Sequence, residues 1–126
     1  MGNETKKERR DQDMHLRMTK TEMAEIEMAS YLADKSKSEC IRRAISSYCK
    51  LLKYAPEVIK EYERGWLWMK DRTDIKKKPR KLVYQIRMNE DELEMLDMVS
   101  YETDDTKADV IRKALKMYAS AKRNGF

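Results

Sequence analysis

Two short runs carry side chains of the kinds that contact DNA bases. Residues 13–18 and 82–88 alternate in character, and side chains two positions apart share one face of a strand. The expected outward-facing set is Asp13, His15, Arg17, Val83, Gln85 and Arg87. Arginine suits the acceptor pair of guanine and glutamine suits adenine, while histidine can take either role less specifically. These six residues are therefore candidate base contacts.

The opposite face of each run is apolar, and this indicates how the runs must be positioned. The inward set is Met14, Leu16, Met18, Leu82, Tyr84, Ile86 and Met88. Such alternation predicts half-buried strands. Because a single strand cannot satisfy its own backbone, we expect the two runs to pair antiparallel, with one face on the core. A two-stranded ribbon of this kind fits the major groove of B-DNA.

The two strands belong to a repeat with an offset of seventy residues. Residues 41–45 recur as 111–115, and the register holds without a gap from Arg17 and Arg87 to Tyr48 and Tyr118. Each copy reads as a strand, a helix, a turn and a second helix. A unit of this length is marginal as an isolated monomer, so the two copies should share one core.

Capping pairs mark the starts of the four expected helices, each with a side chain that can accept from the first helical turn. These pairs are Thr19 with Glu22, Ser36 with Glu39, Asn89 with Glu92 and Thr106 with Asp109. Apolar residues then recur at helical spacing, which indicates the buried face of each helix. The expected core positions are Met23, Ile26, Ala29, Ala33, Cys40, Ile41, Ala44, Ile45, Tyr48, Leu93, Leu96, Val99, Val110, Ile111, Ala114, Leu115 and Tyr118. We expect residues 119–126 to fray.

The start of the second helix in each copy is a candidate phosphate site. The first N–H groups of a helix are unsatisfied and the helix dipole is positive there. The residues at these two ends are Ser36, Lys37, Ser38, Thr106 and Lys107. Two such ends beside one ribbon would hold the DNA backbone and fix the register. Ser36 and Thr106 can act as ordinary N-caps at the same time.

Residues 50–81 form a bridge between the copies. Pro56 is expected to end one helix and to begin another, in which Val58, Ile59 and Tyr62 share a face. Trp66 and Trp68 are expected to pack the bridge onto the core or onto a partner. The bridge ends in a basic run that is either solvated or lies along a phosphate backbone. Its residues are Lys76, Lys77, Lys78, Arg80 and Lys81.

The repeated pattern resembles the ribbon-helix-helix superfamily of DNA-binding proteins, the Arc and MetJ type. In the first copy the resemblance is carried by Leu16-Arg17-Met18-Thr19, Ala29, Ser36-Lys37-Ser38-Glu39, Ile41-Arg42-Arg43-Ala44-Ile45 and Tyr48. In the second copy it is carried by Ile86-Arg87-Met88-Asn89, Ile111-Arg112-Lys113-Ala114-Leu115 and Tyr118. Both copies lack the glycine that is common between the two helices of this superfamily. Asp34 and either Asp104 or Asp105 are expected to take the left-handed conformation instead.

The resemblance implies a mainly α fold of two tandem units. A two-stranded antiparallel ribbon and four core helices would form an intramolecular pseudo-dimer, with the bridge as an extra helical segment. We expect a disordered charged arm at 1–12, a first unit at 13–49, a helical and basic bridge at 50–81 and a second unit at 82–121. Residues 13–121 would then make one fused domain. The competing arrangement is a dimer of chains with two separate ribbons, each formed from like units.

The function implied is sequence-specific binding of double-stranded DNA, as in a transcriptional repressor or a plasmid or conjugation accessory factor. The alternative is an interaction protein, an antitoxin or a relaxosome component, whose bridge binds a protein partner or a second copy. The candidate contacts for that role are Tyr62, Trp66, Trp68 and Met69. The fused units are unequal, so the DNA site need not be palindromic.

Composition limits the other classes of function. The 126 residues carry a formal net charge of +5, which favours an acidic partner only weakly. One histidine and two cysteines without CxxC spacing predict no metal site, and no motif predicts a cofactor. We do not expect an enzyme, because nothing in the sequence resembles a nucleophile with a base, a carboxylate pair in a pocket or a Gly-rich phosphate loop. No signal peptide or membrane span is expected, which favours a cytoplasmic protein with reduced thiols; the resemblance implies a prokaryotic or mobile-element origin.

Overall fold

A two-stranded antiparallel sheet joins the two copies of the repeat. It consists of β1 (Gln12–Met18) and β2 (Leu82–Met88), which pair over their whole lengths. The opposed residues on its exposed face are Asp13 with Arg87, His15 with Gln85, and Arg17 with Val83. The computed structural model describes residues 10, 12–61, 64 and 80–125. Within these residues the predicted antiparallel pairing of the two strands is confirmed, and it occurs within one chain.

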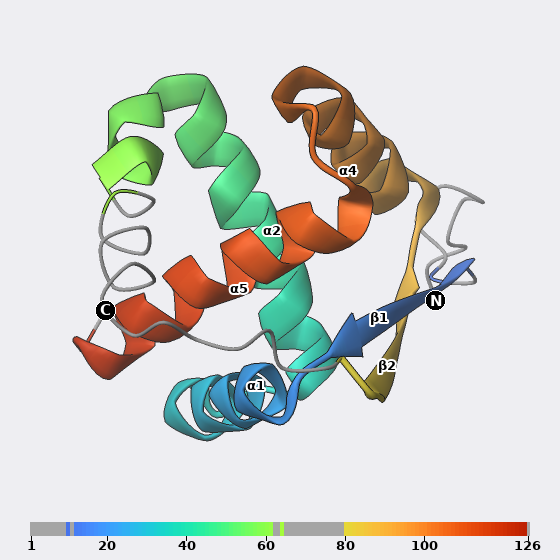
Figure 1. The fold of residues 1–126 in the computed structure, drawn as a ribbon, viewed down its shortest axis with the longest axis vertical. Coiled ribbons are helices and arrows are strands. Elements are labelled where there is room, and N and C mark those ends of the chain that lie inside the picture. Colours follow the sequence, from blue (N-terminus) through green and yellow to red (C-terminus); the bar gives the residue numbers. More distant parts are fainter. Residues whose placement is uncertain (1–9, 11, 62–63, 65–79, 126) are drawn as a thin grey trace, which may run out of the picture.

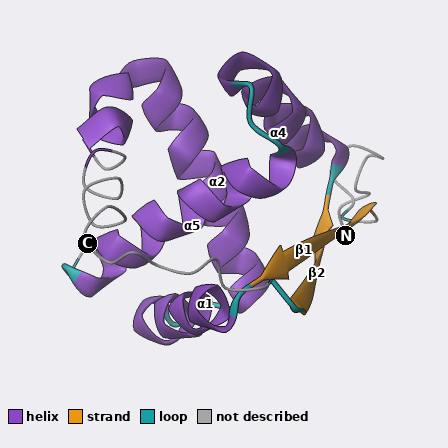
Figure 2. Cartoon of the chain, viewed as in Figure 1, coloured by secondary structure: helices purple, strands orange, loops and turns teal. Residues whose placement is uncertain are grey.

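Most of the described chain is helical, as the repeat predicts. The two helices after β1 are α1 (Lys20–Ala33) and α2 (Lys37–Tyr54), and the two after β2 are α4 (Glu90–Thr103) and α5 (Lys107–Arg123). Residues 56–61 form a further helical turn, which begins at the proline that ends α2. Figure 1 shows α2 and α5 crossing at the centre, and Figure 2 shows the strands together on one side of the helices.

The capping boxes predicted at the N-termini of α1 and α4 are both present. The Thr19 hydroxyl accepts from the Glu22 N–H at 3.1 Å, and the Glu22 carboxylate accepts from the Thr19 N–H at 2.8 Å. Asn89 and Glu92 make the same pair of bonds at 2.8 and 2.9 Å. Two otherwise orphaned backbone donors are thus satisfied at each helix start.

The predicted capping box at Ser36 forms only in part. The Ser36 hydroxyl accepts from the Glu39 N–H at 3.1 Å, but the Glu39 carboxylate accepts from Arg42 and Arg43, each at 3.2 Å. Two guanidinium groups on the same helix compete for this carboxylate, and they are stronger donors than a backbone amide. Glu39 therefore stabilises the first turns of α2 through its side chain rather than by closing the box.

An aspartate in the left-handed conformation ends the first helix of each copy. Asp34 has φ 54° and ψ 46°, and Asp104 has φ 58° and ψ 27°. These two are the non-glycine residues with positive φ in the described part of the chain. The expectation that aspartate replaces glycine in these turns is confirmed, and the second turn uses Asp104 rather than Asp105.

The core lies between the inner face of the ribbon and the helices. Leu16, Met18, Ile86 and Met88 from the ribbon are fully buried. The other buried apolar residues are Ile26, Ala29, Cys40, Ile41, Ala44, Ile45, Tyr48, Ile59, Leu96, Val99, Val110, Ile111, Ala114, Leu115, Met117 and Ala119. Each large aliphatic side chain among them stabilises the fold by about 1.5–3 kcal/mol. The predicted core positions Met23, Ala33, Leu93 and Tyr118 are only half-buried.

The end of α5 differs from expectation. Residues from 119 onward were expected to fray, but α5 continues to Arg123. The reason is that Met117 and Ala119 are buried, so the last turns of the helix pack against the rest of the fold and are held there. Ile59 in the bridge is also buried and joins the same core.

Some of the expected features lie outside the described residues. These are most of the N-terminal arm, the bridge residues Tyr62, Trp66, Trp68 and Met69, and the basic residues Lys76, Lys77 and Lys78. Among the helices that are described, none has the length and apolar character needed to cross a membrane.

Candidate nucleic-acid interface

The outer face of the ribbon carries the six predicted base-contact residues, and all six are exposed. They form three cross-strand rows, since opposed residues on paired strands lie side by side. We call these the acidic row (Asp13 and Arg87), the central row (His15 and Gln85) and the apolar row (Arg17 and Val83). Together the rows present donors, acceptors and one apolar surface to solvent.

Asp13 and Arg87 form an ion pair across the acidic row. The Arg87 Nε lies 3.4 Å from the Asp13 Oδ1, and the two side chains are 72% and 41% exposed, respectively. An ion pair as exposed as this one contributes about 0–1 kcal/mol, so either group can exchange its partner for another at little cost. The side chain of Arg17 in the apolar row has no ion pair or hydrogen bond with any of the described residues.

Two arginines from the second helices hold the ribbon in place. Arg112 of α5 donates to the carbonyl of Arg17 from Nη2 at 2.7 Å and from Nε at 3.2 Å. Arg42 of α2 donates to the carbonyl of Arg87 from Nη1 at 3.1 Å. Each second helix is therefore fastened to the strand of the other copy, at the residue whose side chain points outward. Both guanidinium groups are mostly buried, with side chains 15% exposed.

Sequence reasoning did not single out these two arginines. The available signal was an arginine at one repeat position, 42 and 112, directly after the buried isoleucine of each second helix. Periodicity alone places such a residue beside the apolar stripe but does not say what its guanidinium group contacts. The contact is non-local, and it becomes visible only once β1 and β2 are paired.

The N-termini of α2 and α5 are built as the sequence predicted. Ser36 and Thr106 are the N-caps, and their hydroxyls accept from the N–H groups of Glu39 and Asp109, each at 3.1 Å. An N-cap satisfies only part of the first turn, so further N–H groups there can bind an anion. The hydrogen bonds from Arg42 and Arg112 to the strand carbonyls place the first turns of both helices near the ribbon.

The lysines at these helix starts both form ion pairs; Lys107 is exposed and Lys37 is half-buried. Lys37 Nζ lies 3.6 Å from the Glu27 carboxylate of α1, and Lys107 Nζ lies 2.6 Å from the Asp97 carboxylate of α4. These contacts tie each lysine to the preceding helix, close to the N-cap. As surface ion pairs they are weak and screened by salt, so the lysines remain able to bind phosphate.

Ser38 makes a different contact from its neighbours. Its hydroxyl lies 2.9 Å from the Tyr84 hydroxyl on β2, and the residue is half-buried. The corresponding residues in the other copy, Ala108 and Met14, cannot form such a bond. Ser38 thus connects α2 with the ribbon in addition to its position in the first helical turn.

Arginines before each strand contact the capping glutamate of the other copy. The Arg10 Nε lies 3.2 Å from the Glu92 carboxylate, and the Arg80 Nε lies 3.2 Å from the Glu22 carboxylate. Arg80 was predicted to follow a phosphate backbone, and this contact places it at the start of α1. Lys81 beside it is exposed.

Most of these contacts therefore occur twice, at positions seventy residues apart. The matching pairs are Arg42–Arg87 and Arg112–Arg17, Arg10–Glu92 and Arg80–Glu22, Lys37–Glu27 and Lys107–Asp97, and Glu39–Arg42 and Asp109–Arg112. The recurrence extends from the ribbon to the helix starts on both sides of it. The ribbon-side surface is thus built from two near-equivalent halves.

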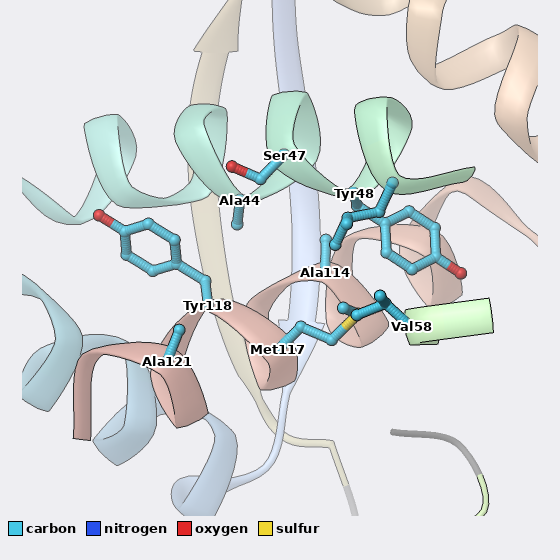
Figure 3. A pocket seen from close by; sticks show the side chains of 9 residues that line it. Ala44, Ser47, Tyr48, Val58, Ala114, Met117, Tyr118 and Ala121 are labelled. Carbon is cyan, nitrogen blue, oxygen red and sulfur yellow. The ribbon is translucent and has the colours of Figure 1, made fainter. Parts of the chain in front are cut away.

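An apolar hollow near the core is lined by helix residues and by none from the ribbon. It has a volume of about 180 Å³ and lies between α2 and α5, partly open to solvent, with Val58 at its edge. Figure 3 shows the Tyr48 and Tyr118 rings at opposite ends of it, with Ala44, Ala114 and Met117 between them. Its walls carry few polar groups. The described residues contain no cluster of three His, Cys, Asp or Glu side chains that could hold a metal ion.

Comparison of the chain with family models, curated proteins and solved structures gave no match in any of the three. Its function must therefore be inferred from the exposed ribbon face and the two helix ends beside it.

Proposed function

We propose that this chain is a sequence-specific double-stranded DNA-binding protein of the ribbon-helix-helix type. Its two repeats act as an intramolecular pseudo-dimer that inserts the ribbon into the major groove. The observation that carries this proposal is the exposed ribbon face, with an arginine on each strand and a helix start fastened to each side. A role as a transcriptional repressor or a plasmid or conjugation accessory factor is consistent with such binding.

The dimensions and chemistry of the ribbon support this function. A two-stranded β-ribbon fits the major groove, where each base pair presents a distinct set of donors and acceptors. Arg17 and Arg87 match guanine and Gln85 matches adenine. The carbonyls of Arg17 and Arg87 accept hydrogen bonds from Arg112 and Arg42, which hold the backbone at both arginines before DNA arrives. Preorganisation of this kind lowers the entropic cost of binding.

The two helix starts supply contacts that do not depend on sequence. The candidate phosphate ligands are Ser36, Lys37, Ser38, Thr106 and Lys107, with Arg80 and Lys81 as further backbone contacts. Because they occur on both sides of the ribbon, they would grip both edges of the groove and set its register. Binding through such contacts weakens steeply as salt concentration rises.

The decisive experiment is selection of bound duplexes from a random pool, followed by affinity measurements on the selected site. Arg17→Ala and Arg87→Ala should each lose about 1–3 kcal/mol of binding free energy, or about five- to 150-fold in affinity, and relax specificity at one base. Arg123→Ala at the far end of α5 removes the same charge and is the matched control. It should change affinity little. Parental binding of every duplex by both ribbon variants would refute the proposal.

A further inference from the structure

The two outer rows of the ribbon are chemically unequal. In an exact repeat, Asp13 and Val83 would be the same residue, because they occupy equivalent positions seventy residues apart. The arginines at 17 and 87 do match. One outer row is therefore an arginine beside a carboxylate, and the other is an arginine beside an isopropyl group. The phosphate-binding ends around them remain near-equivalent.

The acidic row has a preference that the apolar row lacks. Arg87 is a donor only, and ionised Asp13 is an acceptor only, and their side chains lie within 3.4 Å of each other. In the major groove a G·C pair offers acceptors on guanine and the N4 donor on cytosine. The row can therefore satisfy both of its charges on guanine and cytosine. An acceptor such as thymine O4 facing Asp13 would instead leave the carboxylate without a donor and repel it.

The apolar row favours a different base. Val83 is 55% exposed on a face that is otherwise polar, and it can make no hydrogen bond. The thymine methyl group is the apolar feature of the major groove that such a side chain contacts. Arg17 beside it has no acceptor among the described residues and can bind guanine directly. This row therefore suits a guanine next to a thymine.

We infer that the chain binds a non-palindromic duplex in one orientation, with Asp13 as the residue that sets the direction. The acidic row lies over a G·C end of the site and the apolar row over a guanine–thymine end. This inference rests on the proposed function and adds the class of target to it. The helix starts on the two sides are near-equivalent and contact the backbone only, so the direction comes from the ribbon rows.

The test compares sites selected from a random duplex pool by the full-length parent and three variants. The parent should select a motif with unlike ends. Asp13→Val makes both outer rows arginine with valine, so its motif should have like ends. Asp13→Val combined with Val83→Asp moves the carboxylate opposite Arg17, and should exchange the two ends about the central base pairs. Asp13→Asn keeps the shape, and should reduce discrimination against a changed G·C end about five- to 150-fold.

Different outcomes would contradict the direction of binding and DNA binding itself. A palindromic parental motif, or an unchanged motif in Asp13→Val, would overturn the directional reading while leaving DNA binding intact. Absence of any selected motif in the parent would overturn the proposed function itself. The three ribbon substitutions lie at exposed positions, and far-UV circular dichroism of each variant would verify that it folds. The Arg123→Ala variant should select the parental motif.

Discussion

At the scale of single residues, we expect the guanidinium groups of Arg42 and Arg112 to contribute to the stability of the fold through their bonds to the ribbon backbone. Arg112 makes two hydrogen bonds to the Arg17 carbonyl, whereas Arg42 makes one to the Arg87 carbonyl and has a buried Nε with no partner in the described part of the chain. A hydrogen bond from a charged donor stabilises a fold by about 1.5–3 kcal/mol. We expect Arg112→Ala to lower the free energy of unfolding by that amount, and Arg42→Ala by about 1 kcal/mol less. Urea titration followed by circular dichroism measures both.

The neighbouring Arg43 is the control for this prediction. It is more exposed, and among the described residues its ion pair is with the Glu39 carboxylate at 3.2 Å, so Arg43→Ala should cost under about 1 kcal/mol. Equal losses for Arg43→Ala and Arg112→Ala would show that the carbonyl bonds contribute nothing beyond a surface ion pair.

The thiol of Cys49 gives a second prediction at this scale. Burial, and then the nearby negative charge of Glu102, raise the pKa of Cys49 to about 11. A thiol near its ordinary pKa has more thiolate at pH 8 than one with a raised pKa, and thiolate is the reactive form. Iodoacetamide should therefore alkylate Cys49 at least about tenfold more slowly in the folded protein than in urea, as read by mass spectrometry.

The sign of this effect on stability follows from the same pKa shift. The folded state keeps the thiol proton to higher pH than the unfolded state does, so this contribution to stability is lost as pH rises through the window between the two pKa values. Because burial is the larger cause, Glu102→Gln should speed alkylation only partly. Full reactivity in Glu102→Gln would assign the protection to charge instead.

At the scale of elements, the turns after α1 and α4 place a non-glycine residue, Asp34 or Asp104, in the left-handed conformation. Non-glycine residues in the left-handed region are strained, and aspartate reduces that strain without removing it. Asp34→Gly and Asp104→Gly should each raise the free energy of unfolding by about 0.5–1 kcal/mol, while Asp34→Ala should lower it. Thermal and urea unfolding of the three variants would check both signs. Destabilisation by both glycine variants would mean that the carboxylates make a contribution larger than the backbone strain.

The elements themselves were largely predictable from the sequence. Alternation identified both strands and their outward faces, and the capping residues located the helix starts, because both signals are local. The prediction that the Glu39 carboxylate would accept from the Ser36 N–H was wrong, because this carboxylate accepts from Arg42 and Arg43 instead. The contacts of Arg10 with Glu92 and of Arg80 with Glu22 were also missed. They join residues that are far apart in the sequence, so the spacing of residues within one helix or strand does not predict them.

At the scale of the whole molecule, pairing of β1 with β2 within one chain predicts a monomer that is complete by itself. Opposed residues in a ribbon are close enough for a disulfide, and His15 faces Gln85. The variant His15→Cys with Gln85→Cys should form an intrachain disulfide and run as a monomer on a non-reducing gel. In ribbons made from two like strands, residue 15 would instead face its own copy. His15→Cys alone would then give a crosslinked dimer, and that result would refute intrachain pairing.

A consequence of the fused ribbon concerns how the protein can change. In a dimer of identical chains, every mutation appears on both strands, so any new base preference is imposed on both halves of the site at once. Here the codons for Asp13 and Val83 are separate, and each alters one row only. Under the proposed DNA-binding function, a change in one row would therefore alter the base preference at one half of the site and leave the other half as it was. If the ribbon binds DNA as proposed, its base preference could then change one row at a time, which two identical strands do not allow.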